Sequence, residues 1–103
     1  MPLDKITVEN VNHPGQTARV NAAKYAAMRT AMLAFLAQQQ QPADYQTIRE
    51  GVKPLLPGRI FPGGATAGWW IKTVQLDLEA KRILSRTTDK PLRFHLNAEL
   101  EDG

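Results

Sequence analysis

The sequence predicts a mainly helical α+β fold with an N-terminal arm or short strand, three helices and a C-terminal two-stranded hairpin. Three observations lead to this fold class. Residues 67–82 carry an apolar stripe at helical spacing and contain no proline. Residues 92–96 alternate apolar and polar side chains, as in a half-buried strand. Two stretches further upstream have helical patterns and begin at residues that cap helices.

Residues 1–20 form the predicted N-terminal arm. Ile6 and Val8 alternate with polar neighbours, which indicates a short strand. The segment 13–16, His-Pro-Gly-Gln, is typical of a type II turn, because proline presets φ at the second position and glycine accepts a positive φ at the third. We expect the arm either to pack across the core of its own chain or to lie on a partner chain as an exchanged element.

The first two helices are predicted to start at Asn21 and Asp44, which act as N-caps. The first helix covers residues 22–37, and the glutamines at 38–41 with Pro42 end it. The second helix is expected to end either at Val52 or about one turn later, at Leu55 and Leu56, with Pro54 and Pro57 bending or ending it. The side chains of the first helix expected in the core have spacings of three and four: Tyr25, Met28, Met32, Phe35 and Leu36.

The third helix is predicted over residues 67–82, with the hydroxyl of Thr66 accepting a hydrogen bond from a first-turn amide. Steps of about 100° per residue from Val74 define its buried stripe. Residues 83–85 and 92–96 form two strands joined by a polar turn at 87–91. A helix followed by such a hairpin is the back half of a winged helix, so residues 21–96 are expected to form a winged-helix-like domain. The expected stripe is Trp70, Ile71, Val74, Leu78 and the stem of Lys81.

Length and composition place limits on the class of protein. A chain of 103 residues is expected to form one domain. It has no cysteine, which excludes disulfides and permits a reducing compartment. No apolar run reaches the roughly 20 residues that a membrane helix needs, and the N-terminus lacks an apolar signal-peptide core. We therefore expect a cytoplasmic protein with no membrane partner, and a disordered acidic tail at residues 97–103.

The distribution of charge leads to the first functional hypothesis. The formal net charge is +3, and residues 1–96 carry a net +6 because three acids lie in the tail. Five bases between Lys81 and Arg93 are opposed only by Asp89. In a winged helix that binds double-stranded DNA, the third helix enters the major groove and the basic turn contacts the backbone. The residues expected to bind nucleic acid are Lys72, Thr73, Gln75, Lys81, Arg82, Arg86, Lys90 and Arg93. The alternative for the turn is a solvated loop that protects a sheet edge.

The face of the third helix opposite Val74 leads to a second hypothesis. It holds Trp69 and Leu76, with Lys72 and Glu79 beside them and Gln75 at its edge. A glutamate there repels phosphate, and two large apolar residues indicate that protein covers this face: the N-terminal arm of the same chain, the arm of a second copy, or a separate partner. The domain would then form a homodimer or bind another protein, with Trp69 and Leu76 at the centre of the interface. We prefer nucleic-acid binding by a small margin, because winged helices are used that way most often.

The sequence offers little for catalysis. His13 and His95 lie far apart, and no cluster of acids has the spacing of a metal site. Asp77 is better explained as the partner of Lys81 in an i,i+4 ion pair. The glycines between 58 and 63 imitate a Walker A loop, but Gly64 stands where that motif needs its lysine. We expect no enzyme, no cofactor and no metal.

Four segments carry a resemblance to a known family: VENVNHPGQTARVNAAKY, VKPLL, FPGGATAGWWIKTVQLDLEAK and KPLRFH. They resemble a family of small uncharacterised bacterial proteins, a domain of unknown function with a winged-helix-like fold. The resemblance extends from about Ile6 to His95. It implies the fold, and it carries over no activity and no catalytic residue.

Overall fold

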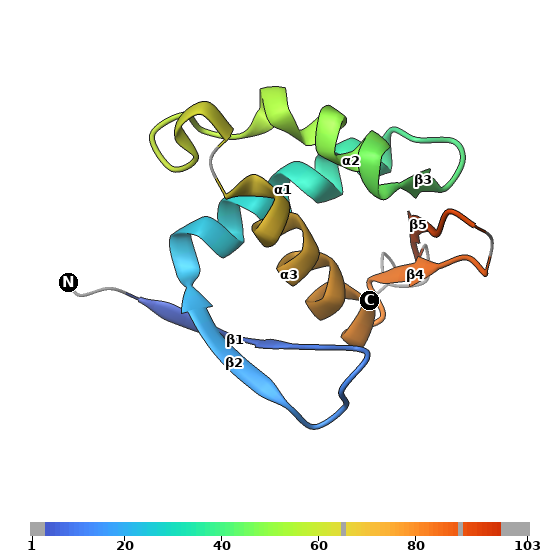
Figure 1. The fold of residues 1–103 in the computed structure, drawn as a ribbon, viewed down its shortest axis with the longest axis horizontal. Helices are drawn as coiled ribbons and strands as arrows, with labels where there is room; N and C mark the ends of the chain where they lie inside the picture. Colours follow the sequence, from blue (N-terminus) through green and yellow to red (C-terminus); the bar gives the residue numbers. More distant parts are fainter. Residues whose placement is uncertain (1–3, 65, 89, 98–103) are drawn as a thin grey trace.

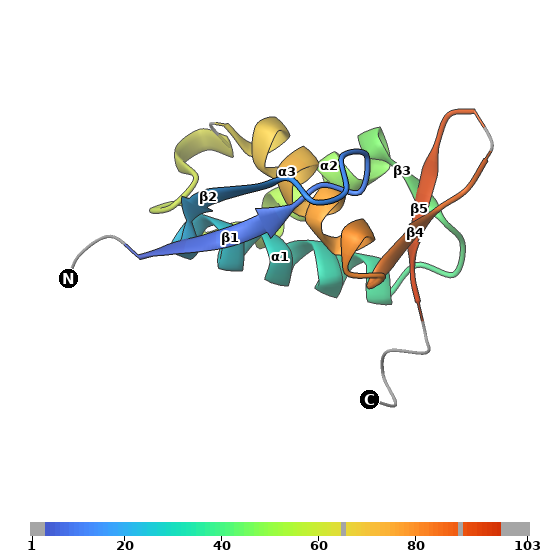
Figure 2. The same ribbon diagram turned by 90° about the horizontal axis from the view of Figure 1, so that it is seen from below.

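The computed structural model describes residues 4–64, 66–88 and 90–97, and over these residues the chain has an α+β fold with three α-helices and two small antiparallel sheets (Figure 1). Helix α3 lies at the centre and packs against α1, α2, β1 and β4 (Figures 1 and 2). The elements in chain order are β1 (Lys5–Glu9), β2 (Thr17–Asn21), α1 (Ala22–Ala37), β3 (Ala43–Asp44), α2 (Tyr45–Val52), the 3-10 turns η1 (Lys53–Leu55) and η2 (Pro62–Gly64), α3 (Ala67–Ala80), β4 (Leu84–Arg86) and β5 (Arg93–Leu96).

Helix α1 has the bounds that the sequence predicts. The side chain of Asn21 accepts a hydrogen bond from the amide of Lys24 at 2.9 Å, so the predicted cap is confirmed. Four of its five expected core side chains are buried, and the fifth, Phe35, is half-buried. The ring of Phe35 lies against Gly51 of α2, where an added Cβ would stand 2.5 Å from Cζ and nearer still to two other ring carbons. Glycine at this position therefore allows α1 and α2 to approach each other closely.

Helix α2 begins at its predicted cap and is only two turns long. The carboxylate of Asp44 accepts from the amide of Thr47 at 2.8 Å, and Pro54 falls in the 3-10 turn that follows the helix. The strand β3, just before α2, was not predicted because two residues carry no periodic signal. It pairs with β5, and the sheet has the order β3-β5-β4.

Helix α3 starts where the sequence predicts, but its N-terminus is not capped by the predicted side-chain hydrogen bond. Thr66 has φ 60° and makes no capping hydrogen bond with its side chain, so the expected hydroxyl cap is wrong. In this left-handed conformation Thr66 instead contributes its carbonyl oxygen, which accepts from the amide of Trp70. The helix ends at Ala80 rather than residue 82, because Arg82 adopts a φ of 64° and the amide of Ile83 bonds back to Leu78.

The predicted buried stripe of α3 is confirmed for its four apolar residues but not for Lys81, whose side chain is 38% exposed, and the buried surface is wider than that stripe. Trp70, Ile71, Val74 and Leu78 are all buried. Three polar residues are buried as well: Gln75, Asp77 and Glu79. The expectation that Gln75 and Glu79 lie on or beside a solvent-exposed face is therefore wrong, because α3 packs against elements on several sides instead of one.

The N-terminal segment forms a complete β-hairpin in place of a single strand. Strands β1 and β2 pair antiparallel, and the predicted turn is present, with Gly15 at φ 91° and the amide of Gln16 bonded to the carbonyl of His13. The hairpin packs on α3 and α1 of its own chain, with Val8 in the core (Figure 2). The expected disordered tail at residues 97–103 begins one residue too early, because the amide of Asn97 donates to the carbonyl of Ile83; residues 98–103 lie outside the described residues.

Candidate binding face

The outer face of α3, defined here by Trp69, Lys72, Thr73 and Leu76, is the part of this helix that the core leaves uncovered. Trp69 is 57% exposed, the largest value among the described large apolar side chains that stand out from the surface. Its ring meets the buried ring of Trp70 edge to face, with centroids 4.9 Å apart. Edge-to-face contacts of this kind are favourable for aromatic pairs, so the buried ring of Trp70 stabilises this position of the outer indole.

The N-terminal hairpin covers one side of the outer face. A groove of about 210 Å³ separates the hairpin from α3 and is lined by Trp69, Thr73 and Leu76 on the helix side. Val8, Ala18 and Val20 line it on the hairpin side. Thr73 and Leu76 are half-buried. Of the two predicted interface residues, Trp69 is therefore available to a partner, whereas Leu76 mainly supports the hairpin.

Asp77 is the residue that attaches this hairpin to α3. Its side chain is fully buried and accepts from the amide of Glu9 at 2.8 Å and from the hydroxyl of Tyr25. The ammonium of Lys81 contacts the same carboxylate, which confirms the predicted i,i+4 pair. Burial, together with the hydrogen bond to this carboxylate, raises the pKa of Tyr25 well above its usual range. Lys81, which was expected to contact phosphate, is thus paired with Asp77, and its Nζ also lies 3.7 Å from Oε2 of Glu9.

Glu79 has an equivalent role toward the C-terminal hairpin. Its carboxylate accepts from Nε of Arg86 at 2.5 Å, from Nη2 of the same residue at 3.1 Å, and from the side-chain Nε2 of Gln75 at 2.8 Å. The hydrogen bond that Arg86 donates to Glu79 raises the pKa of Arg86. Two more residues expected to bind nucleic acid, Arg86 and Gln75, are therefore bound to a buried carboxylate of the same chain.

The remaining predicted cations do not form one cluster. Lys72 is exposed on the outer face, and Lys90 is exposed in the turn between β4 and β5. Arg82 is exposed beyond the C-terminal end of α3, where its carbonyl accepts from the side chain of Asn97. Arg93 is half-buried and lies near Asp44. The amide of Thr47 holds the pKa of Asp44 below its usual range, with a smaller contribution from the charge of Arg93.

A second groove opens on the other side of Lys72, between α2, α3 and the C-terminal hairpin. Its volume is about 630 Å³, and Tyr45, Pro91 and Leu92 form much of its lining. Leu92 is 40% exposed. The outer face of α3 therefore has an apolar groove along each side, with Trp69 and Lys72 on the ridge between them.

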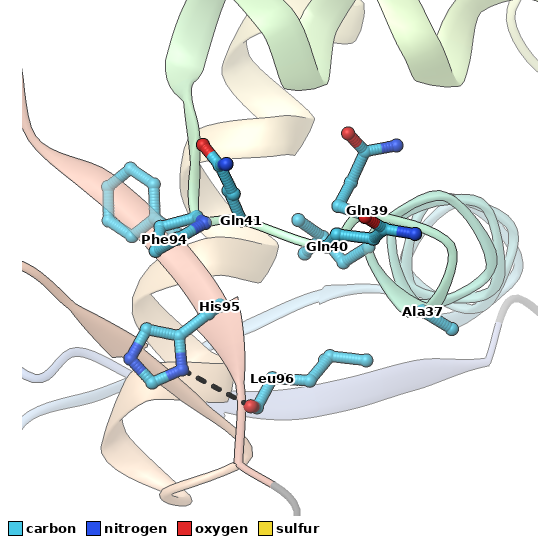
Figure 3. Close-up of a pocket in the computed structure, with 9 residues that line it drawn as sticks. Ala37, Gln39, Gln40, Gln41, Phe94, His95 and Leu96 are labelled. Carbon is cyan, nitrogen blue, oxygen red and sulfur yellow. Dashed lines mark hydrogen bonds between the residues drawn. The ribbon is translucent and has the colours of Figure 1, made fainter.

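A third pocket, of about 500 Å³, lies between the loop that follows α1 and strand β5 (Figure 3). His95 and the glutamines at 39–41 are among its lining residues, and Nδ1 of His95 lies 3.2 Å from the carbonyl oxygen of Leu96. The lining contains one imidazole and no carboxylate. In the parts of the chain that the structure describes, no group of three or more histidines or acids could hold a metal ion, and no helix is long and apolar enough to cross a membrane.

The sequence offered the N-terminal arm of the same chain as one possible cover for this face, and the hairpin does cover one side of it, but the second strand of that hairpin was not predicted. The signal was present, because Ala18 and Val20 alternate with Thr17 and Arg19 directly after the predicted turn. The sequence also did not reveal that Glu79 is an internal anchor. That role depends on Arg86, seven residues away and on another element, so no periodic pattern reports it.

The comparisons with known proteins give a family but no function. Neither the curated proteins nor the solved structures include a significant match to this chain. A family model described as a family of unknown function, DUF6958, matches residues 5–94. That range includes the N-terminal hairpin, all three helices, the outer face of α3, strand β4 and the first half of β5. The match agrees with the domain of unknown function expected from the sequence, and the chain belongs to the family DUF6958.

Proposed function

We propose that this domain is a non-enzymatic binding module of winged-helix-like architecture that docks a protein partner on the outer face of α3, with Trp69 at the centre of the contact. The element order α1-β3-α2-α3-β4-β5 and the sheet order β3-β5-β4 support the winged-helix-like arrangement. Fold alone does not decide what such a domain binds, so the choice of partner depends on the exposed side chains.

The exposure of Trp69 is the observation that carries the proposal. A tryptophan that is 57% exposed and packs edge to face on a buried aromatic neighbour is a typical energetic anchor of protein interfaces. Apolar grooves flank it on both sides, and Leu92 adds a second exposed apolar side chain near the far groove. An exposed tryptophan beside two apolar grooves favours a protein over the polar and charged surface of a DNA groove.

Double-stranded DNA is the second candidate, and the exposed ammonium groups of Lys72 and Lys90 favour it. One lies on the outer face of α3 and the other in the turn between β4 and β5, the two elements with which winged helices contact DNA. Lys81, Arg86 and Gln75 contribute less to this candidate than the sequence alone would indicate, because buried carboxylates already hold them.

Titration with duplex DNA tests the second candidate directly. Phosphate contacts make the binding constant fall steeply as salt rises, and Lys72→Ala with Lys90→Ala should reduce that dependence. We expect no measurable binding at low salt. A steep salt dependence that the double variant flattens would favour DNA over a protein partner.

Photo-crosslinking tests the protein partner. A benzophenone amino acid at position 69 is expected to give an adduct of defined mass in the producing cells, whereas the same group at exposed Arg59, in the loop after α2, gives none. The protein identified in the adduct is then purified and titrated with the domain. Trp69→Ala is expected to weaken that binding at least tenfold, which corresponds to about 1.4 kcal/mol. Unchanged affinity of this variant would remove Trp69 from the interface and contradict the proposal.

A further inference from the structure

The backbone hydrogen bonds of the N-terminal hairpin determine which groups point outward. Ala22 donates to the carbonyl of Asp4 at 3.0 Å, so the residue pairs that exchange hydrogen bonds are the even-numbered ones, such as Val8 with Ala18. The amide of Glu9 agrees with this pattern, because it points away from β2 and binds Asp77. By the same alternation, the amide and carbonyl groups of Thr17 and Arg19 point away from β1.

These groups form an unpaired edge along β2. Over residues 4–64, 66–88 and 90–97, no hydrogen bond engages the backbone of Thr17 or Arg19, and both residues are exposed. An exposed edge of this kind is a template for another strand. Strand β1 differs, because its outer edge is already tied to α3 through Glu9 and Asp77.

The free edge of β2 lies beside Trp69. Thr17, Ala18 and Val20 line the same groove as the indole ring. A strand added to β2 would continue the face of the hairpin that carries Ala18 and Val20, so every second side chain of that strand would point toward α3. Backbone pairing and a contact with Trp69 are thus available to one extended segment.

The charges at this edge indicate which kind of segment fits. Strand β2 contains no acid, and its central residue, Arg19, is exposed and has no ion-pair partner among the described residues. Lys72, next to Trp69 on the outer face, is likewise unpaired in that part of the chain. A second copy of the chain fits poorly, because two antiparallel β2 strands in full overlap would place Arg19 opposite its own copy.

From these observations we infer that the domain captures an extended acidic segment of its partner by strand addition to the outer edge of β2, with an apolar side chain of that segment on Trp69. This inference rests on the proposed function and specifies the chemistry of the partner. Main-chain hydrogen bonds supply the affinity, and the alternating apolar and acidic side chains supply the selectivity.

The test uses the full chain and a fluorescent peptide of about ten residues that alternates valine and glutamate. We expect binding, with shifts of the amide resonances of Thr17 and Arg19 in NMR spectra and slower hydrogen exchange at both. Alternate residues of the added strand point their N–H groups toward β2. The same peptide with N-methyl groups on those residues should not bind. Arg19→Glu should weaken binding at least tenfold, whereas Lys5→Glu, on the neighbouring strand, should change it less than twofold.

Each contrary outcome has a definite meaning. Absence of binding, or binding that N-methylation of either alternate set of residues leaves unchanged, overturns strand addition. Tighter binding of a valine and lysine peptide overturns the acidic character of the segment. Binding that shifts only Trp69 and leaves the amides of Thr17 and Arg19 unaltered overturns strand addition as well, but it leaves the proposed docking on Trp69 in place. Unchanged affinity of the crosslinked partner for the Trp69→Ala variant is a separate result, and it contradicts the proposed function itself.

Discussion

Replacement of Asp77 by alanine is expected to destabilise the domain by about 3 kcal/mol and to release the N-terminal hairpin. The carboxylate accepts hydrogen bonds from the amide of Glu9 and the hydroxyl of Tyr25, and each bond to a buried charged group contributes about 1.5–3 kcal/mol. We count the ion pair with Lys81 as close to zero, because the lysine side chain is 38% exposed. The expected loss lies at the lower end of the sum of these two hydrogen-bond contributions, because the alanine variant also no longer has to bury a charge. A loss of this size is a large share of the roughly 5–15 kcal/mol that holds a small domain together.

Urea unfolding followed by circular dichroism measures the total change, and amide hydrogen exchange locates it. The exchange rate at Glu9 should rise more than rates within α2, because the hairpin loses its attachment. Glu50→Ala is the matched control: it removes an acid whose exposed side chain pairs at 3.7 Å with Lys53, and it should change stability by less than about 0.5 kcal/mol. If Asp77→Ala were as mild as this control, the hydrogen bonds assigned to the carboxylate would not stabilise the fold.

Three further predictions follow from the helices. Gly51→Ala should destabilise the domain by about 1–2 kcal/mol in urea unfolding, because the new Cβ displaces the ring of Phe35. This loss outweighs the intrinsic preference of helices for alanine over glycine, which is about 1 kcal/mol. A more stable variant would mean that the ring moves aside freely. Asn21→Ala should raise the free energy of the folded state by about 1 kcal/mol through loss of the cap on α1, measured by thermal unfolding, and Asn21→Ser should recover most of it. Because the pKa of Tyr25 is raised in the folded state, its ionisation favours unfolding, and the free energy of unfolding should hold below about pH 10 and decline above it. Tyr25→Phe should flatten this alkaline decline. An equally steep decline in the variant would assign the decline to other groups.

The helices could be predicted from the sequence because their signals are local. The caps at Asn21 and Asp44 and the break at Pro54 are read from neighbouring residues. Helix α1 has both predicted bounds, and α2 begins at its predicted cap and ends at Val52, the earlier of the two predicted ends. Strand β3 could not be predicted, since two residues form a strand only because β5 lies beside them. Strand β2 could have been predicted by extending the alternation of β1 across the Pro-Gly turn.

The candidate site could be predicted only in part for a related reason. A helical wheel assumes one buried side, and that assumption identifies Trp69 correctly as an exposed apolar residue. It fails for Gln75 and Glu79, because the C-terminal hairpin covers the part of α3 where they lie and brings Arg86 onto the glutamate. Net charge fails in the same way, since it counts Lys81 and Arg86 as available cations while buried acids on α3 already engage them.

The attachment of Glu9 to Asp77, which joins residues 68 positions apart, has a consequence for the order in which the chain assembles. During synthesis the ribosome releases the hairpin first and its anchor on α3 much later, so Val8 must wait for the core that will cover it. We expect the contact to form after the rate-limiting step of refolding, because distant pairs close late. Kinetics of a conservative Asp77→Asn variant would then show faster unfolding with refolding almost unchanged.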